Sequence, residues 1–245
     1  METHAQKWRQ LVETRRRSFG PERPANFWER QAGRYAFSMR QQADPFWDFV
    51  QPWLRPVLTA IDAGAGTGRH AVPLADRLDW VTAVEPEEAM RRLIPDRPNM
   101  TVVASTWEEA DVAPADLVIS CHVLYSIPEP VPFLEKMSSL ARERAFVSLR
   151  DGPQPHPAER LAGRPLEPTL SDVVDVLEEM GLKPEVERWR QPVVFRWEDR
   201  PSAEEDWRLR GWSGALEGVE EAAEGTLRFD AGMRVGGVAH WKRTS

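Results

Sequence analysis

The chain has little that could cross-link it or bind a metal. Among its 245 residues there is one cysteine, Cys121, and the five histidines lie far apart in the sequence. A single cysteine excludes an internal disulfide framework and a cysteine-rich zinc site. The histidines show no carboxylate–histidine spacing typical of a ligand set, so we expect no metal.

Long apolar runs are absent as well. No stretch of about 18 apolar residues occurs, which predicts that no helix spans a membrane. The first residues, METHAQKWRQ, lack the apolar core of a secretory signal. We therefore expect a soluble cytoplasmic protein. At ~100–200 residues per domain, the length predicts one large domain or one domain with appendages.

Tryptophan and arginine are abundant instead. The chain has 11 tryptophans, and arginine supplies 28 of its 32 basic residues. Although the net charge is −7, residues 1–40 carry nine basic and four acidic side chains, which is a local excess of five positive charges. A helix with Trp8, Leu11 and Val12 on one face and solvated arginines on the other explains this excess more simply than a phosphate-binding surface does.

Seven apolar runs predict β-strands. They are residues 57–62, 80–85, 100–105, 115–120, 144–150, 185–197 and 226–241. Between the first five runs, three segments have helical spacing of apolar residues: 69–78, 86–94 and 130–143. Strands that alternate with helices predict right-handed βαβ units and a doubly wound α/β fold, with a mostly parallel sheet covered on both faces.

Local signals set several element boundaries. Pro73 lacks a backbone N–H, so the helix around it should kink or begin late. Thr169 and Asp172 form a capping-box pattern, and Gly181 is placed to end the helix that follows them. Asp230-Ala231-Gly232 predicts a turn beside the last strand.

The sharpest motif is a glycine-rich loop between the first strand and the helix after it. It reads Asp62-Ala63-Gly64-Ala65-Gly66-Thr67-Gly68. Glycine lets the backbone turn tightly and lets a ligand approach the main chain without meeting a side chain. The helix that follows adds unpaired N–H groups and a partial positive charge. A turn that binds nothing is the alternative, but an acidic residue ending the next strand, Glu85, favours a ligand site.

The loop does not fit the phosphate-binding patterns. A dinucleotide loop has its third glycine at the sixth position, which here, counted from Gly64, is Arg69. A P-loop needs Gly-Lys-Ser/Thr, which is missing. Asp62 at the loop entrance would repel a pyrophosphate and suits a ligand with an ammonium group. The motif therefore indicates a nucleoside that carries an amino acid.

These residues resemble the class I S-adenosylmethionine-dependent methyltransferases, in their small-molecule, type 11-like subgroup. The resemblance spans residues from about 55 to 245. It implies a Rossmann-like, seven-stranded and mostly parallel sheet whose last strand runs antiparallel beside the sixth. It also implies an N-terminal helical cap over residues 1–57 and a methyltransferase domain over 58–245, with a lid-like insertion near 198–225.

That family uses its acidic and glycine-rich loop to hold the methionine part of S-adenosylmethionine, whose product is S-adenosylhomocysteine. The resemblance implies this role for five residues of the loop: Asp62, Gly64, Ala65, Gly66 and Gly68. An acidic residue at the end of the second strand holds the ribose hydroxyls, and Glu85 followed by Pro86 matches it.

The resemblance places further residues around the cofactor. Thr106 and Trp107 correspond to the adenine contacts, with Trp107 able to pack on the ring, although Thr106 stands where the family often has aspartate. Ser120 and Cys121 end the fourth strand at the mouth of the cofactor site. Tyr35 matches a tyrosine of the helical lead-in that often reaches the cofactor.

His122 and Tyr125 are the candidate catalytic residues. Methyl transfer from a sulfonium is an in-line displacement, so the protein mainly positions the reacting atoms and excludes water. His122 ends a strand on the cofactor side and is placed to act as a base for an acceptor that carries a proton. The alternative is that it only hydrogen-bonds the cofactor or the backbone. Tyr125 either orients the substrate or packs.

The sequence therefore predicts a methyltransferase for an apolar or aromatic small molecule, bound under an aromatic-lined cap. Trp28, Trp207 and Trp212 are the candidates for lining that cap. The negative net charge and the lack of an RNA-binding module argue against nucleic acid, while the basic N-terminal stretch leaves an RNA methyltransferase as an alternative. A cofactor-binding or regulatory protein without turnover is the other alternative. No motif identifies the acceptor atom or the oligomeric state.

Overall fold

The computed structural model describes residues 2–18, 27–40, 42–152, 167–209, 216–222 and 225–242. Its helices are α1 His4–Ser18, α2 Phe27–Arg40, α3 Pro45–Val50, α4 Ala71–Ala75, α5 Glu88–Arg91, α6 Pro130–Leu140, α8 Leu170–Glu179 and α9 Arg200–Leu209, with 3-10 turns η1 Gln51–Trp53 and η2 Leu124–Ser126. Its strands are β1 Thr59–Ala63, β2 Trp80–Val84, β3 Met100–Val103, β4 Ala115–Cys121, β5 Ala141–Arg150, β6 Glu185–Trp197, β7 Glu220–Glu221 and β8 Leu227–Trp241.

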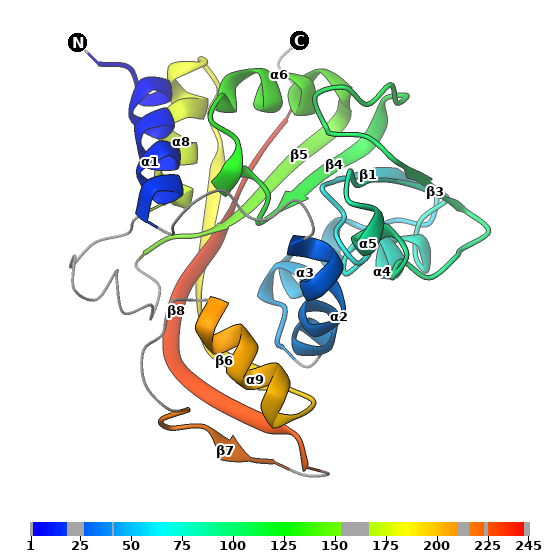
Figure 1. Ribbon diagram of the computed structural model, residues 1–245. Coiled ribbons are helices and arrows are strands. Elements are labelled where there is room, and N and C mark those ends of the chain that lie inside the picture. Colours follow the sequence, from blue (N-terminus) through cyan, green and yellow to red (C-terminus); the bar gives the residue numbers. More distant parts are fainter. Residues whose placement is uncertain are drawn as a thin grey trace.

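The strands form one sheet in the order β3-β2-β1-β4-β5-β8-β6 (Figure 1). The first five are parallel to their neighbours, while β8 lies between β5 and β6 and runs antiparallel to both. The predicted α/β fold with a mostly parallel, seven-stranded sheet and an antiparallel last strand is confirmed. The short strand β7, which pairs with β8, is an addition that the sequence did not predict.

Successive residues of the central strands face opposite helical layers. Ile61 and Val118 pack toward α1, α6 and α8, whereas Ala60 and Leu117 pack toward α3 and α4. This alternation follows from the two-residue period of a strand and explains why these strands read as continuous apolar runs. Segment 1–57 contributes to both layers, because α1 and α3 lie on opposite faces of the sheet.

Several boundary predictions hold. The helix around Pro73 begins late, at Ala71, so the missing N–H of proline falls in the first turn, where no intrahelical partner is needed. The capping box of Thr169 and Asp172 starts α8, and Gly181, with φ +79°, follows its end.

Other boundary predictions were wrong. The segment 141–143 belongs to β5 rather than to the preceding helix, and only four residues of 86–94 form α5. Asp230-Ala231-Gly232 makes no chain-reversing turn. It is a bulge inside β8, where the register with β6 shifts and Gly232 N–H donates to Asp230 Oδ1 at 2.8 Å. An extra residue in one strand bends the pair, and Figure 1 shows β6 and β8 curving away from the sheet together.

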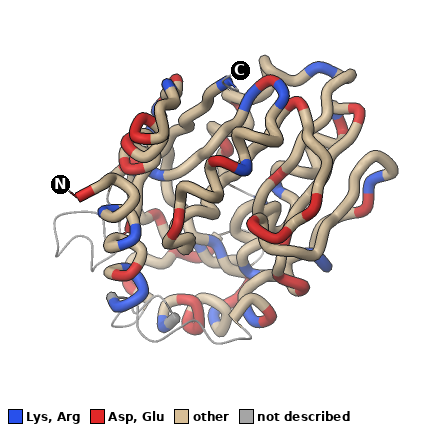
Figure 2. The backbone as a smooth tube through the Cα atoms, turned by 90° about the horizontal axis from the view of Figure 1, so that it is seen from above, with Lys and Arg blue, Asp and Glu red and all other residues tan. Residues whose placement is uncertain are grey.

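In the view of Figure 2, Lys and Arg positions alternate with Asp and Glu positions around the molecule, so neither sign gathers on one side. The basic residues of α1 follow this mixture: Lys7 pairs with Asp172 of α8, while Trp8 and Val12 are fully buried on the opposite face of α1. No helix within the described ranges is long and apolar enough to cross a membrane.

Candidate functional site

The glycine-rich loop joins β1 to α4 at the carboxyl end of the parallel strands. Gly64, Gly66 and Gly68 have φ of +80°, +56° and +79°, a region that residues with side chains rarely occupy. A Cβ on Gly64 would lie 2.3 Å from Val123, and one on Gly68 would lie 3.0 Å from Ile94. A Cβ on Gly66 would meet nothing within 4 Å. Gly66 therefore leaves open space against the main chain, which a ligand can fill.

Glu85, just after β2, is joined directly to this loop. Its Oε2 accepts from the N–H of Gly66 at 2.8 Å, and its Oε1 accepts from the N–H of Glu87 at 2.9 Å. Burial raises the pKa of Glu85, and these two N–H groups oppose the rise. Because each carboxylate oxygen has two lone pairs, Glu85 keeps acceptor capacity for further hydroxyl groups.

Asp62 is buried in β1, directly before the loop. Its side chain is 1% exposed, and its Oδ2 has no hydrogen-bond partner among the described residues. Burial raises the pKa of Asp62 to about 6, although His70 and the N–H of Ala71 lower it. An ionised carboxylate held in this way is costly, so a cation bound nearby would be stabilising.

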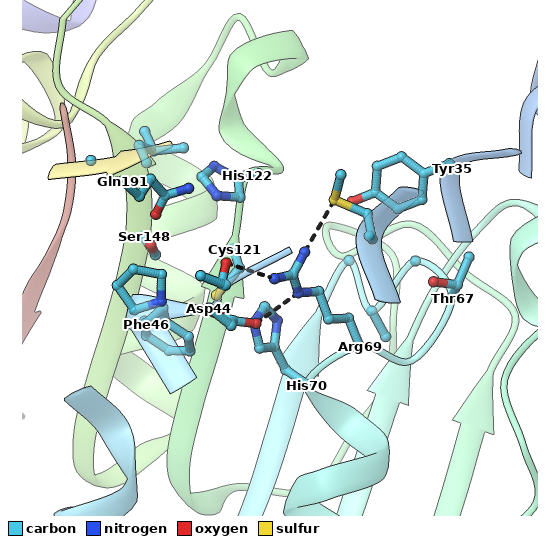
Figure 3. A pocket seen from close by; sticks show the side chains of 18 of the residues that line it. Tyr35, Asp44, Phe46, Thr67, Arg69, His70, Cys121, His122, Ser148 and Gln191 are labelled. Carbon is cyan, nitrogen blue, oxygen red and sulfur yellow. Dashed lines mark hydrogen bonds and ion pairs between the residues drawn. The ribbon is translucent and has the colours of Figure 1, made fainter. Parts of the chain in front are cut away.

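A pocket extends from the glycine loop toward the ends of β4 and β5 (Figure 3). Its walls come from α2, the segment before and into α3, the glycine loop, and strands β4, β5, β6 and β8. Six of the predicted site residues line it: Tyr35, Gly64, Ala65, Gly66, Cys121 and His122. Ligands of open α/β sheets bind at this carboxyl edge.

Arg69 and Asp44 close one wall of the pocket. Arg69 Nε donates to Asp44 Oδ2 at 2.7 Å, and His70 Nε2 lies 3.1 Å from the same oxygen. Burial alone would raise the pKa of Asp44, but His70 and Arg69 hold it well below its usual range. Asp44 also caps α3, so the ion pair ties α3 to the glycine loop and neutralises Arg69. Nowhere in the described ranges do three or more His, Cys, Asp or Glu side chains form a group that could hold a metal.

His122 follows β4 with a backbone unusual for its residue type. Its φ is +61°, the one positive φ outside glycine in the described part of the chain. Holding a bulky residue there costs on the order of 1–3 kcal/mol, and such strain gathers at functional sites. The N–H of His122 donates to the carbonyl of Ser148 at 2.9 Å, which fixes the bend. The ring consequently points into the pocket (Figure 3).

Tyr125 determines which nitrogen of His122 faces the pocket. The N–H of Arg150 donates to the Tyr125 hydroxyl at 2.9 Å, and His122 Nδ1 lies 3.0 Å from the same oxygen. A hydroxyl that accepts from Arg150 can donate its own proton to Nδ1, and in that arrangement the imidazole proton lies on Nε2. Desolvation, reinforced by Arg234, lowers the pKa of His122 to about 3. Because the ring borders the open pocket, that desolvation is complete only when a ligand fills it.

Several predicted site residues lie outside the pocket lining. Ser120 is fully buried, and its Oγ donates at 3.0 Å to the carbonyl that ends β1, which ties β4 to β1. Trp107 is 3% exposed, and its Nε1 donates to Phe133 at 3.2 Å, so the indole packs in the core rather than facing open space. Pro86 and Thr106 are exposed just beyond β2 and β3.

The tryptophans predicted to line a cap are placed differently from one another. Trp207 packs in an aromatic cluster between α9 and the β6–β8 pair. Trp28 contacts Tyr35 edge to face, with ring centres 5.8 Å apart. Trp212 lies outside the described residues. The tryptophan of the pocket wall is Trp189 instead.

Among the wall residues that sequence reasoning missed are Trp189 and Gln191 of β6 and Arg234 of β8. Gln191 and Arg234 are direct register partners across the antiparallel pair. In the sequence they are only polar residues inside predicted strands, 43 positions apart. Their meeting depends on the pairing register, which no local pattern specifies.

Residues 61–149 match the family described as Methyltransferase domain (Methyltransf_11). That range holds the glycine loop, Glu85 and His122, and it covers the strands that form the floor of the pocket. This part of the chain is therefore similar to a methyltransferase domain. A search of curated proteins finds no match for the chain.

Solved structures share the fold of this chain at low sequence identity. A candidate methyltransferase from Bacillus halodurans is 14% identical, with a TM-score of 0.58 over 82% of this chain and 98% of that one. The magnesium protoporphyrin IX methyltransferase of Synechocystis PCC 6803, solved with bound S-adenosylhomocysteine, is 14% identical, with a TM-score of 0.51 over 98% of this chain and 100% of that one. A candidate methyltransferase from an antibiotic biosynthesis pathway of Anabaena variabilis is 19% identical, with a TM-score of 0.52 over 60% and 65%.

Proposed function

We propose that this protein transfers a methyl group from S-adenosylmethionine to a small molecule bound in the pocket. The open face of Gly66, whose N–H is held by Glu85, carries this proposal, because the pocket continues from there toward His122. When bound, S-adenosylmethionine supplies a methyl group that its sulfonium has already activated. The remaining task of the protein is to position the acceptor and exclude water.

The residues around the loop fit the groups of this cofactor. Gly66 leaves room for the methionine part against the main chain, and Asp62 provides negative charge behind the loop for its ammonium group. Glu85 has lone pairs left for the ribose hydroxyls. Tyr35 lines the pocket from α2, and burial raises the pKa of its hydroxyl, so it stays a neutral hydrogen-bonding group. The Synechocystis enzyme of the same fold was solved with S-adenosylhomocysteine, which supports this choice of cofactor.

His122 acts in this proposal as a hydrogen-bond donor rather than as a general base. Its Nδ1 lies 3.0 Å from the Tyr125 hydroxyl, and with the imidazole proton on Nε2 the ring presents a donor to the pocket. A pKa of about 3 also makes the ring a weak base near neutral pH. Cys121 is not a nucleophile here, because burial raises the pKa of its thiol. The site therefore suits an acceptor that is already deprotonated or releases its proton to water.

Calorimetry with S-adenosylmethionine and with NAD tests the cofactor. We expect the first to bind and the second not to bind. Gly66→Val should abolish binding, because its side chain would occupy the open face of the loop. Gly225→Val is the matched control: Gly225 also has a positive φ, +76°, and open space around its Cβ, but it does not line the pocket. Wild-type protein that fails to bind S-adenosylmethionine at millimolar concentration would rule out the proposal.

Turnover separates an enzyme from a protein that holds the cofactor without reacting. The purified protein should transfer labelled methyl groups from S-adenosylmethionine to an extract of small metabolites, and His122→Ala should reduce the transfer. Label that appears only in RNA added to the same reaction would instead identify a nucleic-acid substrate. Binding without transfer to either pool would contradict the methyltransferase activity.

A further inference from the structure

Arg234 brings a positive charge into the pocket that no acid among the described residues neutralises. The pocket wall contains two arginines, Arg69 and Arg234, and one carboxylate, Asp44. Asp44 is already engaged by Arg69 and His70. Arg234 has no hydrogen bond or ion pair with any described residue, and desolvation lowers its pKa. In a chain of net charge −7, a partly buried cation without a counter-charge among the described residues points to a negatively charged ligand.

Two neutral donors lie beside this cation. The Nε1 of Trp189 donates to Gln191 Oε1 at 3.0 Å, which leaves the Gln191 amide group to donate elsewhere. Tyr125 occupies Nδ1 of His122, which leaves its Nε2–H facing the pocket. Figure 3 shows Gln191 and His122 facing each other across one end of the pocket. These groups, from β6 and from the end of β4, offer donors and no acceptor.

Apolar side chains line the pocket beside these donors and the Arg69–Asp44 pair. Phe46, Leu149, Trp189 and Met39 line the pocket together with the polar groups. A guanidinium, an amide and an imidazole N–H match the oxygens of a carboxylate, since Arg binds carboxylates with two parallel hydrogen bonds. Flat apolar walls suit an aromatic or aliphatic body.

We propose that the methyl acceptor carries a carboxylate on an apolar body, held by Arg234, Gln191 and His122. This inference rests on the proposed methyltransferase function and specifies its substrate class. The acceptor would enter on the β6–β8 side, away from the cofactor loop.

The test compares matched acids and amides. Ligand-observed NMR measures the binding of each compound to the S-adenosylhomocysteine complex of the protein. The acids are indole-3-acetate and benzoate, and the matching amides are indole-3-acetamide and benzamide. We expect the acids to bind at least about tenfold more tightly than the amides, because a hydrogen bond to a charged group contributes about that much affinity. Arg234→Met should abolish that preference, and Arg234→Lys should restore part of it. Arg190→Met, which removes an exposed arginine of β6, is the control and should leave the preference intact.

Each contrary outcome is distinct. Equal binding of acids and amides would contradict the carboxylate site. An unchanged preference for acids in Arg234→Met would contradict it too, and so would failure of both acids to bind at millimolar concentration. If phenyl phosphate bound more tightly than the acids, the site would be assigned to a phosphate group rather than to a carboxylate. In all these cases unchanged affinity for S-adenosylhomocysteine leaves the proposed function standing. If wild-type protein did not bind S-adenosylhomocysteine, the proposed methyltransferase function itself would be wrong.

Discussion

At the residue scale, His122 shows how backbone strain and hydrogen bonding combine in this site. A left-handed backbone turns the ring away from the direction that an extended strand would give it. The bond from its N–H to Ser148 and the contact with Tyr125 hold that conformation. The result is a neutral ring whose donor faces the pocket.

Replacing His122 should therefore separate stability from activity. We expect His122→Gly to leave the free energy of unfolding unchanged or to raise it by about 1 kcal/mol, because glycine adopts this φ without strain. Methyl transfer should fall. Urea denaturation and labelled-methyl turnover measure the two effects. His122→Asn, which tolerates the left-handed region and keeps an N–H donor, should retain part of the activity. A glycine variant that is clearly less stable would contradict the assigned strain.

Asp62 makes stability depend on pH. Burial raises its pKa from 3.8 to about 6. As the pH rises between these values, the unfolded chain releases this proton first, so the folded state loses stability. The full effect is on the order of 3 kcal/mol and is present above about pH 6. A bound ammonium group would offset part of it.

Asp62→Asn should remove this dependence. We expect the variant to gain stability over wild type as the pH rises from 4 to 7, while its affinity for S-adenosylmethionine falls because the negative charge is lost. Thermal unfolding across that pH range, with calorimetry of binding, checks both. Asp79→Asn, at an exposed position, is the control and should show no such trend. A stability difference that stays flat with pH would disprove the buried ionisation.

At the scale of elements, α2 and α9 are joined by charge. Glu205 of α9 accepts from Arg30 and Arg34 of α2, next to Tyr35 in the pocket wall. A partly exposed ion pair of this kind contributes ~1 kcal/mol or less to stability. Its larger effect is on the position of α2 over the glycine loop.

We expect Glu205→Gln to raise the KM for S-adenosylmethionine several-fold while the melting temperature changes little. Loosening α2 displaces Tyr35 without disturbing the core. Glu204→Gln is the matched control, because among the described residues Glu204 pairs with Arg200 inside α9 and not with α2. Steady-state kinetics and thermal unfolding of both variants provide the comparison. Equal KM values for the two variants would mean that the link between α2 and α9 has no influence on the site.

Element patterns were predicted well where the signal was local. The capping box of α8 and the strands 185–197 and 227–241 depend on side chains near one another in sequence. The start of β5 was misplaced because Ala141 and Arg142 suit a helix end as well as a strand, and pairing with β4 decides between them. The bulge at Gly232 was read as a turn for the same reason.

At the scale of the whole molecule, α1 is part of the core rather than an appendage. Trp8 is fully buried among residues of the layer that contains α6 and α8, and its Nε1 donates to the carbonyl of Ile127 at 2.8 Å. Ile127 directly follows η2, which contains Tyr125. The N-terminal helix therefore supports the turn that orients His122.

Trp8→Ala should cost about 3–5 kcal/mol in free energy of unfolding, because it leaves a large cavity and an unpaired carbonyl. Trp80→Ala is the control: Trp80 is 43% exposed, and its loss should cost far less. Chemical denaturation of both variants measures the difference. Similar costs would show that α1 does not belong to the cooperative core.

The glycine loop, the acid after β2 and the order of strands and helices were determined by the sequence alone. Each depends on a short pattern whose physical cause is local: backbone freedom at glycine, lone pairs on a carboxylate, apolar spacing along one element. The group of donors at the β6–β8 end of the pocket was decided only by tertiary structure. Gln191, Arg234 and His122 meet because β8 inserts between β5 and β6 in one register. That register follows from burial of side chains far apart in the chain, which no local pattern contains.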